Sequence, residues 1–329
     1  MTRMVRLRHS VLLFAWLAAA LPAAAQPDRA VDLRGAGSDV FVQGAAAGDH
    51  AGSSVVLADV NGDGIDDLIV GAPDAEVPGR AGAGAVYVLF GRRDFPGNLL
   101  VDLAVRSPDV VILGDDPGDF LGGAVAVGDV NGDGRNDIVA SAWGVDEGMR
   151  GDCGAVYVIY GRATYPARID LDATPADLTI YGRSYGDELG RTLALGDLDH
   201  DGIADIIAGA PGAAPGGRGS AGQAHVLFGR RDYPPQALVD LVGRLSDITV
   251  YGRYPFNYLG SSVASGDFNN DGIADLVVGA RFASKQMVQA GEVYMLYGRP
   301  LWSTPFILDL GTGAQPDFTL IGRYSGDNL

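Results

Sequence analysis

Short apolar runs recur along the whole chain, and clusters of glycine, aspartate and asparagine separate them. In the first part of the sequence these runs cover residues 40–43, 54–57, 68–70 and 85–90. Runs of this length, rich in valine, isoleucine and leucine and bounded by turn-forming residues, predict β-strands. No run of 10 to 15 residues has the hydrophobic period of an amphipathic helix. The pattern therefore predicts an all-β protein.

The strands belong to a unit that the chain repeats. An aspartate-rich segment at residues 59–67 returns at 129–137, 197–205 and 267–275, with starts 70, 68 and 70 residues apart. A second marker, a hydrophobic residue followed by Asp-Leu, keeps the same spacing at 31–33, 101–103, 169–171, 239–241 and 308–310. The units are 31–100, 101–168, 169–238, 239–307 and a partial unit, 308–329. We expect the intact protein to be longer, since the fifth unit stops midway.

The length of the repeated unit favours one β-architecture over the others. Separate sandwich domains need about 100 residues each, and the turns of a solenoid are much shorter than this repeat. Roughly four strands per unit, repeated radially, build the blades of a β-propeller. The sequence predicts four complete blades and the start of a fifth within residues 31–329.

The first 25 residues do not fit this pattern. Arg3, Arg6 and Arg8 precede an apolar run at 11–21 that ends in an alanine-rich segment, which predicts a secretory signal peptide at residues 1–25. The run is shorter than the roughly 20 residues that a membrane span needs. We therefore expect a protein that is secreted, lies at the cell surface or is periplasmic.

The amino-acid composition limits the classes of partner that the protein can bind. The formal net charge of −17 argues against nucleic acid or an anionic membrane as a partner. Cys153 is the single cysteine, so no disulfide within the chain stabilises the exported protein. Many of the acidic residues are clustered in the repeated segments, which indicates a specific role for them.

Each repeated segment places oxygen-bearing side chains at its positions 1, 3, 5 and 9, with glycine at position 6. Position 7 varies, so it offers only its backbone carbonyl. The candidate ligands are Asp59, Asn61, Asp63, Ile65 and Asp67; Asp129, Asn131, Asp133, Arg135 and Asp137; Asp197, Asp199, Asp201, Ile203 and Asp205; and Asp267, Asn269, Asp271, Ile273 and Asp275.

Hard oxygen ligands in a flexible loop favour Ca²⁺, while Mg²⁺ demands a stricter octahedron. The alternative is a set of ordinary Asp/Asn/Gly turns without an ion. Like charges 4 Å apart repel by roughly 4 kcal/mol at an effective dielectric of about 20, and a turn does not need that charge. We predict about four calcium ions, one for each complete unit.

The residues after the loops carry a family resemblance. The segments Gly71-Ala72-Pro73 and Gly209-Ala210-Pro211, and the strand at 85–91, resemble the FG-GAP repeat of integrin α-subunit propellers and of bacterial secreted proteins. The resemblance implies a seven-bladed propeller with its calcium loops on the face away from the main partner-binding surface.

The chain departs from the family pattern at several positions. The Phe-Gly pair becomes Ala51-Gly52, Leu121-Gly122, Leu189-Gly190 and Leu259-Gly260, and Gly-Ala-Pro becomes Ser141-Ala142-Trp143 and Gly279-Ala280-Arg281. We expect the leucines to preserve an apolar plug. The sequence contains no helical inserted domain of the integrin kind.

Three functions compete. The first is a non-catalytic propeller that binds an extracellular protein or glycan through variable segments at 74–80, 144–151 and 212–220, with Trp143, Met149 and Arg150 as a candidate anchor. The second is an architectural module of a larger surface protein. The third is a non-catalytic propeller attached to a hydrolase such as a phospholipase D-type enzyme, although only about five residues separate the signal peptide from the first repeat.

No catalytic constellation stands out in the sequence. His225 occupies the strand position of Tyr87, Tyr157 and Tyr294, so we expect a core or interface residue. Cys153 falls on an expected turn without a partner. The sequence therefore predicts no enzyme.

Overall fold

The computed structural model describes residues 40–94, 99–104, 108–283 and 289–323. The expected signal peptide, the first Asp-Leu marker at 31–33 and the last residues, 324–329, lie outside these ranges. Strands dominate the described chain, and its two helices are single 3₁₀ turns, η1 (Pro215–Gly217) and η2 (Leu310–Thr312). The all-β prediction is confirmed.

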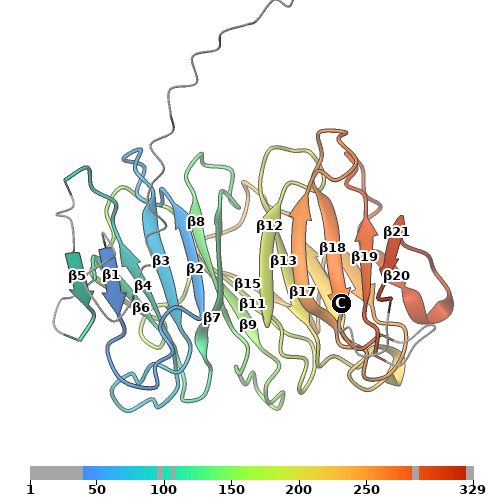
Figure 1. Cartoon of the computed structure of the whole chain (residues 1–329), viewed down its shortest axis with the longest axis horizontal. Helices are drawn as coiled ribbons and strands as arrows, with labels where there is room; N and C mark the ends of the chain where they lie inside the picture. The colour runs from blue at the N-terminus through green and yellow to red at the C-terminus, as the bar shows by residue number, and fades with distance from the viewer. Residues whose placement is uncertain (1–39, 95–98, 105–107, 284–288, 324–329) are drawn as a thin grey trace, which may run out of the picture.

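Four twisted sheets stand side by side in chain order (Figure 1), and each is a propeller-type blade. The innermost strands are β2 (Ser54–Ala58), β7 (Leu121–Gly128), β12 (Thr192–Gly196) and β17 (Leu259–Gly266). The second strands are β3 (Asp67–Ala72), β8 (Asp137–Ala142), β13 (Asp205–Ala210) and β18 (Asp275–Ala280). The third strands are β4 (Ala85–Leu89), β9 (Ala155–Ile159), β14 (Gln223–Leu227) and β19 (Glu292–Leu296).

The outer strands come from the following repeats. The fourth strands are β6 (Val110–Leu113), β11 (Leu178–Tyr181), β16 (Ile248–Tyr251) and β21 (Phe318–Ile321). A fifth strand pairs in parallel with three of these: β10 (Arg168–Asp170) on β6, β15 (Ala237–Asp240) on β11 and β20 (Phe306–Asp309) on β16. In the same way β5 (Leu99–Asp102) pairs in parallel with β1 (Val40–Gln43).

The sheets are therefore offset from the sequence repeat. The strands predicted at 40–43, 54–57, 68–70 and 85–90 all form, but β1 pairs with β5 and not with β2. The first blade takes β2, β3 and β4 from the first repeat, β6 from the second and β10 mainly from the third. Each of the three five-stranded sheets thus joins segments from three successive repeats.

Apolar cores fill the spaces between blades. Ile69 and Val86 of the first blade pack in one cluster with Leu121 and Ile138 of the second. Equivalent clusters join the second blade to the third and the third to the fourth. Because central strands are covered on both faces, β8 and β13 are buried along their whole length. Leu121, Leu189 and Leu259 are fully buried, which confirms them as apolar plugs.

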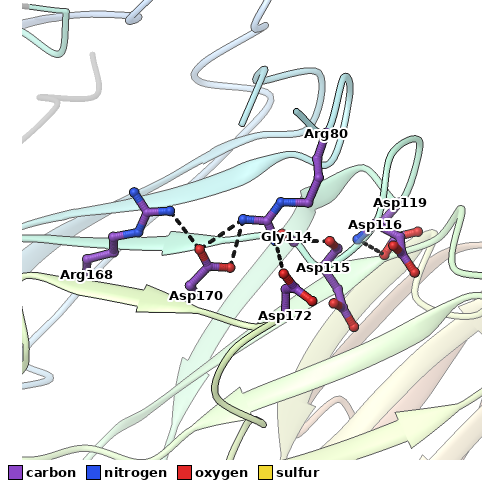
Figure 2. A network of polar contacts seen from close by, with 8 residues as sticks. All are labelled: Arg80, Gly114, Asp115, Asp116, Asp119, Arg168, Asp170 and Asp172. Atoms are coloured by element: carbon purple, nitrogen blue, oxygen red, sulfur yellow. Dashed lines mark hydrogen bonds and ion pairs between the residues drawn. The ribbon is translucent and has the colours of Figure 1, made fainter. Parts of the chain in front are cut away.

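An arginine clamp fastens the fifth strand to each of the first three sheets. Arg80 Nη2 lies 2.8 and 2.9 Å from the two carboxylate oxygens of Asp170, and its Nη1 donates to the carbonyl oxygen of Gly114 at 2.7 Å. Figure 2 shows this guanidinium between Asp170, which Arg168 also contacts, and the start of the loop at Asp115. The marker aspartate of this repeat, Asp170, thus has a structural role.

The clamp recurs in the next two blades. Arg150 binds both carboxylate oxygens of Asp240 at 2.9 Å and the carbonyl of Gly182, and Arg218 binds Asp309 at 2.6 Å and the carbonyl of Gly252 at 3.1 Å. A two-point, charge-assisted contact of this kind stabilises more than an ordinary hydrogen bond.

We expect Arg150→Ala to lower the free energy of unfolding by about 2 kcal/mol, because a half-buried aspartate loses its cation and the fifth strand its fastening. Urea unfolding in saturating calcium measures the change. Arg92→Ala is the matched control, since Arg92 is 47 % exposed in its pair with Asp109 and such pairs contribute at most about 1 kcal/mol. Equal losses in the two variants would contradict the clamp.

Candidate metal centres

The four aspartate-rich loops join the first strand of each blade to the second. They cover residues 59–66, 129–136, 197–204 and 267–274 and all lie at one end of the sheets, which we call the acidic end. The loops between second and third strands, and those that join successive blades, lie at the other end, because neighbouring antiparallel strands reverse direction. We call that the variable end.

Backbone conformation explains the glycine at position 6 of each loop. Gly64, Gly134, Gly202 and Gly272 have φ between +81° and +87°, a region that side chains with a Cβ rarely adopt. The turn brings the backbone N–H groups of the loop toward the side chain at position 1. Asp59 accepts hydrogen bonds from the N–H groups of Gly62 at 2.6 Å and Gly64 at 2.8 Å.

The same local contacts recur in the other loops. The position-1 carboxylates of Asp129, Asp197 and Asp267 each accept from the glycine at position 6 at 2.8 to 2.9 Å. The position-5 carboxylates accept from the N–H of position 7, in the pairs Asp63 with Ile65, Asp133 with Arg135, Asp201 with Ile203 and Asp271 with Ile273. The side-chain oxygens of Asn61, Asn131, Asp199 and Asn269 accept from the N–H of position 5. The four loops therefore share one geometry.

The aspartate at position 9 has a structural role that the sequence did not reveal. Asp67 is fully buried at the start of β3, and its carboxylate accepts from Val60 N–H at 3.0 Å and from Gly91 N–H at 2.9 Å. The equivalent pairs of donors are Val130 and Gly161 for Asp137, Leu198 and Gly229 for Asp205, and Phe268 and Gly298 for Asp275. Each of these aspartates ties its loop to the end of the third strand.

Burial makes the ionised form of three position-9 carboxylates, those of Asp67, Asp137 and Asp205, less favourable. It raises the pKa of Asp137 to about 7 and that of Asp205 to about 8, against the opposing effect of their backbone hydrogen bonds. Burial also raises the pKa of Asp67. For Asp59 burial acts in the same direction, but the N–H groups of Gly64, Gly62 and Asp63 outweigh it and hold the pKa below its ordinary value.

The third loop brings three carboxylates together. Oxygens of Asp197, Asp199 and Asp205 all lie within 4.8 Å of one another. This oxygen-only set fits a hard divalent cation, and neighbouring negative charge favours such an ion. In the other three loops an asparagine supplies the oxygen at position 3. Of the residues that the sequence singled out, the structure thus brings Asp197, Asp199 and Asp205 of the third loop around a common point.

Other residues singled out by the sequence lie away from the acidic end. Trp143 stacks on Phe120 with ring centroids 4.3 Å apart, and the Arg191 guanidinium lies 4.0 Å from its centroid. Arg150 belongs to the clamp, while Met149 is 99 % exposed. Two members of the candidate anchor are therefore engaged inside the protein.

His225 and Cys153 are both buried. The His225 ring is 4 % exposed on β14, and its Nδ1 lies 3.0 Å from Ser246 Oγ, as expected of a core strand residue. Burial lowers the pKa of His225 to about 4, with a smaller contribution from the charge of Arg183. Cys153 is fully buried, and burial raises the pKa of its thiol, which disfavours the reactive thiolate.

The lowered pKa of His225 predicts a pH dependence. The unfolded chain binds a proton below about pH 6.5 and the folded chain only near pH 4, so stability present above pH 6.5 is lost as the pH falls toward 4. We expect wild type to lose up to roughly 3 kcal/mol more than His225→Gln over this range. Urea unfolding of both proteins at several pH values measures the difference. Parallel pH profiles would contradict a neutral buried histidine.

Comparison with known proteins agrees with this geometry. A family model of the FG-GAP repeat matches residues 51–89, 121–159, 189–227 and 259–296. Each match spans the first three strands of one blade and the acidic loop between the first two. The chain is therefore a β-propeller protein built from FG-GAP repeats.

The curated relatives include two types of protein. Phosphatidylinositol-glycan-specific phospholipase D of Mus musculus is 34 % identical over 206 residues, which cover 63 % of this chain and 23 % of that protein. The Bos taurus protein of the same name is 31 % identical over 219 residues, covering 67 % and 25 %. Integrin alpha pat-2 of Caenorhabditis briggsae is 28 % identical over 244 residues, covering 70 % and 18 %. The chain spans a quarter or less of the length of these relatives.

Proposed function

We propose that this chain is a secreted, calcium-binding, non-catalytic β-propeller whose variable end binds an extracellular protein or glycan. The observation that carries the proposal is the fourfold repetition of one acidic loop geometry, with three carboxylates within 4.8 Å of one another in the third loop. A turn that served only to reverse the chain would not need this charge. Calcium offsets the repulsion and stabilises the start of each second strand.

The separation of the two ends supports a binding role. The acidic end is uniform from blade to blade, whereas the loops at 74–80, 144–151 and 212–220 differ in sequence at the variable end. Loops of differing chemistry on a rigid scaffold are the usual place for recognition. The propeller presents them, and the ions at the other end hold the scaffold in shape.

A count of bound ions tests the metal sites. In equilibrium dialysis we expect about one calcium ion for each of the four loops, and Asp205→Asn to lose one because a ligand is removed. Asp199→Asn is the matched control, since it gives the third loop the asparagine that the other three already carry; it should weaken that site without abolishing it. Equal stoichiometry in wild type and Asp205→Asn would contradict the assignment of position 9.

A second candidate is a non-catalytic module within a larger protein, which includes the propeller of a hydrolase. The observation in its favour is the 34 % identity to a phospholipase D that is confined to 23 % of that protein. Among the residues that the structure describes, no helix has the length and apolar character needed to cross a membrane. The extended reading frame tests this candidate: further domains beyond the repeats would favour a module.

A further inference from the structure

A small polar cavity opens at the variable end of the third blade. Its volume is about 240 Å³. Arg183, Ser184, Tyr185 and Asp187 line it from the loop that joins the second blade to the third, and residues 214–216 line it from the loop between β13 and β14. Gln223 and Tyr251 complete the lining from the ends of β14 and β16. The cavity is of a size to hold a single sugar ring.

Gln223 marks this cavity as a site for a ligand. The residue is 6 % exposed, and its Oε1 has no hydrogen-bond partner among the described residues. Buried polar atoms are nearly always paired, so an unpaired one needs an explanation. The same strand position holds Ala85 in the first blade, Ala155 in the second and Glu292 in the fourth. A glutamine is therefore not required by the blade, and its oxygen is available to a donor that enters the cavity.

The other lining groups complement a polyhydroxylated ligand. Asp187 is 3 % exposed, and its carboxylate accepts from Ser184 N–H at 2.9 Å. The Arg183 side chain supplies donors at the rim, while the Tyr185 ring is 76 % exposed. Acceptors, donors and a flat aromatic surface thus surround one small space. Sugar hydroxyls both donate and accept hydrogen bonds, and the C–H face of a sugar packs on an aromatic ring.

An aromatic surface continues the site onto the fourth blade. Tyr254, Phe256, Tyr258 and Phe282 line a second cavity, of about 520 Å³. The N–H groups of Phe256 and Tyr258 donate to the carbonyls of Gly219 and Ser220 at 3.0 and 3.1 Å. Within the loop at 212–220, residues 214–216 therefore line the first cavity, while Gly219 and Ser220 hold the aromatic segment through their carbonyls.

The conformation of Phe256 shows that this aromatic surface is not a consequence of the fold. Phe256 is 64 % exposed and has φ of +61°, which is unfavourable for a bulky side chain. The corresponding loops of the other repeats have Gly48, Gly118 and Gly186 at this position. Strain that the fold can avoid with glycine is typical of functional positions.

We propose that an oligosaccharide binds across these two cavities, with one sugar ring beside Gln223 and Tyr185 and the neighbouring residues of the glycan on the Phe256 surface. This inference rests on the proposed function, which makes the variable end the interaction face. It adds the site and the ligand class, because the volume of the polar cavity suits a single sugar ring and the unpaired Gln223 oxygen needs a hydroxyl donor.

The probe is an array of defined neutral and acidic oligosaccharides, followed by titration of the full chain in saturating calcium with the best-bound member. We expect Gln223→Ala and Tyr185→Ala each to weaken binding about tenfold, the effect of one lost contact of 1.4 kcal/mol, and Phe256→Gly to weaken it comparably. Gln223→Ala and Phe256→Gly introduce residues that other repeats already use at these positions. Leu301→Ala, at an 89 % exposed residue after β19, is the control.

The outcomes separate this inference from the proposed function. Glycan binding that survives all three substitutions would overturn the site and leave the interaction role intact. Binding of immobilised extracellular proteins without glycan binding would overturn the ligand class alone. Failure to bind either kind of partner would overturn both. Unchanged melting temperatures of the variants in calcium exclude loss of fold as the cause of weaker binding.

Discussion

Chelation of calcium is expected to lower the melting temperature of this chain by on the order of 10 °C. An ion that binds only the folded state stabilises it by about 1.4 kcal/mol when free calcium is tenfold above Kd. Four equivalent loops together contribute several kcal/mol on this scale, and each kcal/mol shifts the midpoint by about 1.5 to 2 °C in a chain of this size. Differential scanning fluorimetry with and without a calcium-selective chelator measures the shift.

Controls make this expectation specific. The chelator is applied in excess magnesium, so that general ionic effects remain constant, and calcium is then restored beyond the chelator concentration. The midpoint should return to its starting value. A midpoint that is unchanged by chelation would show that the acidic loops hold their shape without an ion, and the calcium assignment would fall.

The second large effect is expected from Gly182→Ala. Gly182 begins the loop between the second and third blades, and its N–H donates to the carbonyl of Gly154 at 2.8 Å. A Cβ at this position would lie 2.8 Å from the carbonyl carbon of Cys153 and closer still to its oxygen. Both obstacles are backbone atoms, so no rotamer change removes the overlap. We expect a loss of more than about 3 kcal/mol or failure to fold.

Gly243→Ala is the matched control for this substitution. Gly243 follows β15, and a Cβ there meets no atom within 4 Å. The change should leave the free energy of unfolding within about 0.5 kcal/mol of wild type. Urea unfolding of both variants in calcium gives the comparison. Similar stability of Gly182→Ala and Gly243→Ala would contradict the close approach at the start of the interblade loop.

The fold and the acidic loops could be predicted because their signals are local and repeated. The oxygen-bearing side chains at fixed positions, with Gly64 and its counterparts, specify one loop conformation four times. Apolar runs of strand length specify the strands. Leu121 and the equivalent leucines are buried because leucine keeps the apolar character of the phenylalanine that the family pattern has at this position.

The remaining features depend on long-range pairing, which a local pattern does not encode. Nothing in the segment at 168–170 indicates that it pairs with Val110–Leu113, almost 60 residues earlier. The partner of Arg150, Asp240, lies 90 residues away. The unpaired oxygen of Gln223 emerges only when two loops and two strand ends close around it. The one available signal was the fixed spacing between the clamp arginines and the marker aspartates.

The offset between sheet and repeat has a consequence for how the protein can be cut or shortened. Excision of the repeat at 169–238 would remove β11 to β14, two of the three residues of β10 and half of β15, so it would damage the first, second and third sheets at once. Neighbouring modules are thus interlaced and not merely stacked. We therefore expect proteolytic cleavage within one repeat to destabilise the neighbouring repeats as well. In tandem arrays whose modules contact one another only across their faces, we expect a smaller effect on the neighbours.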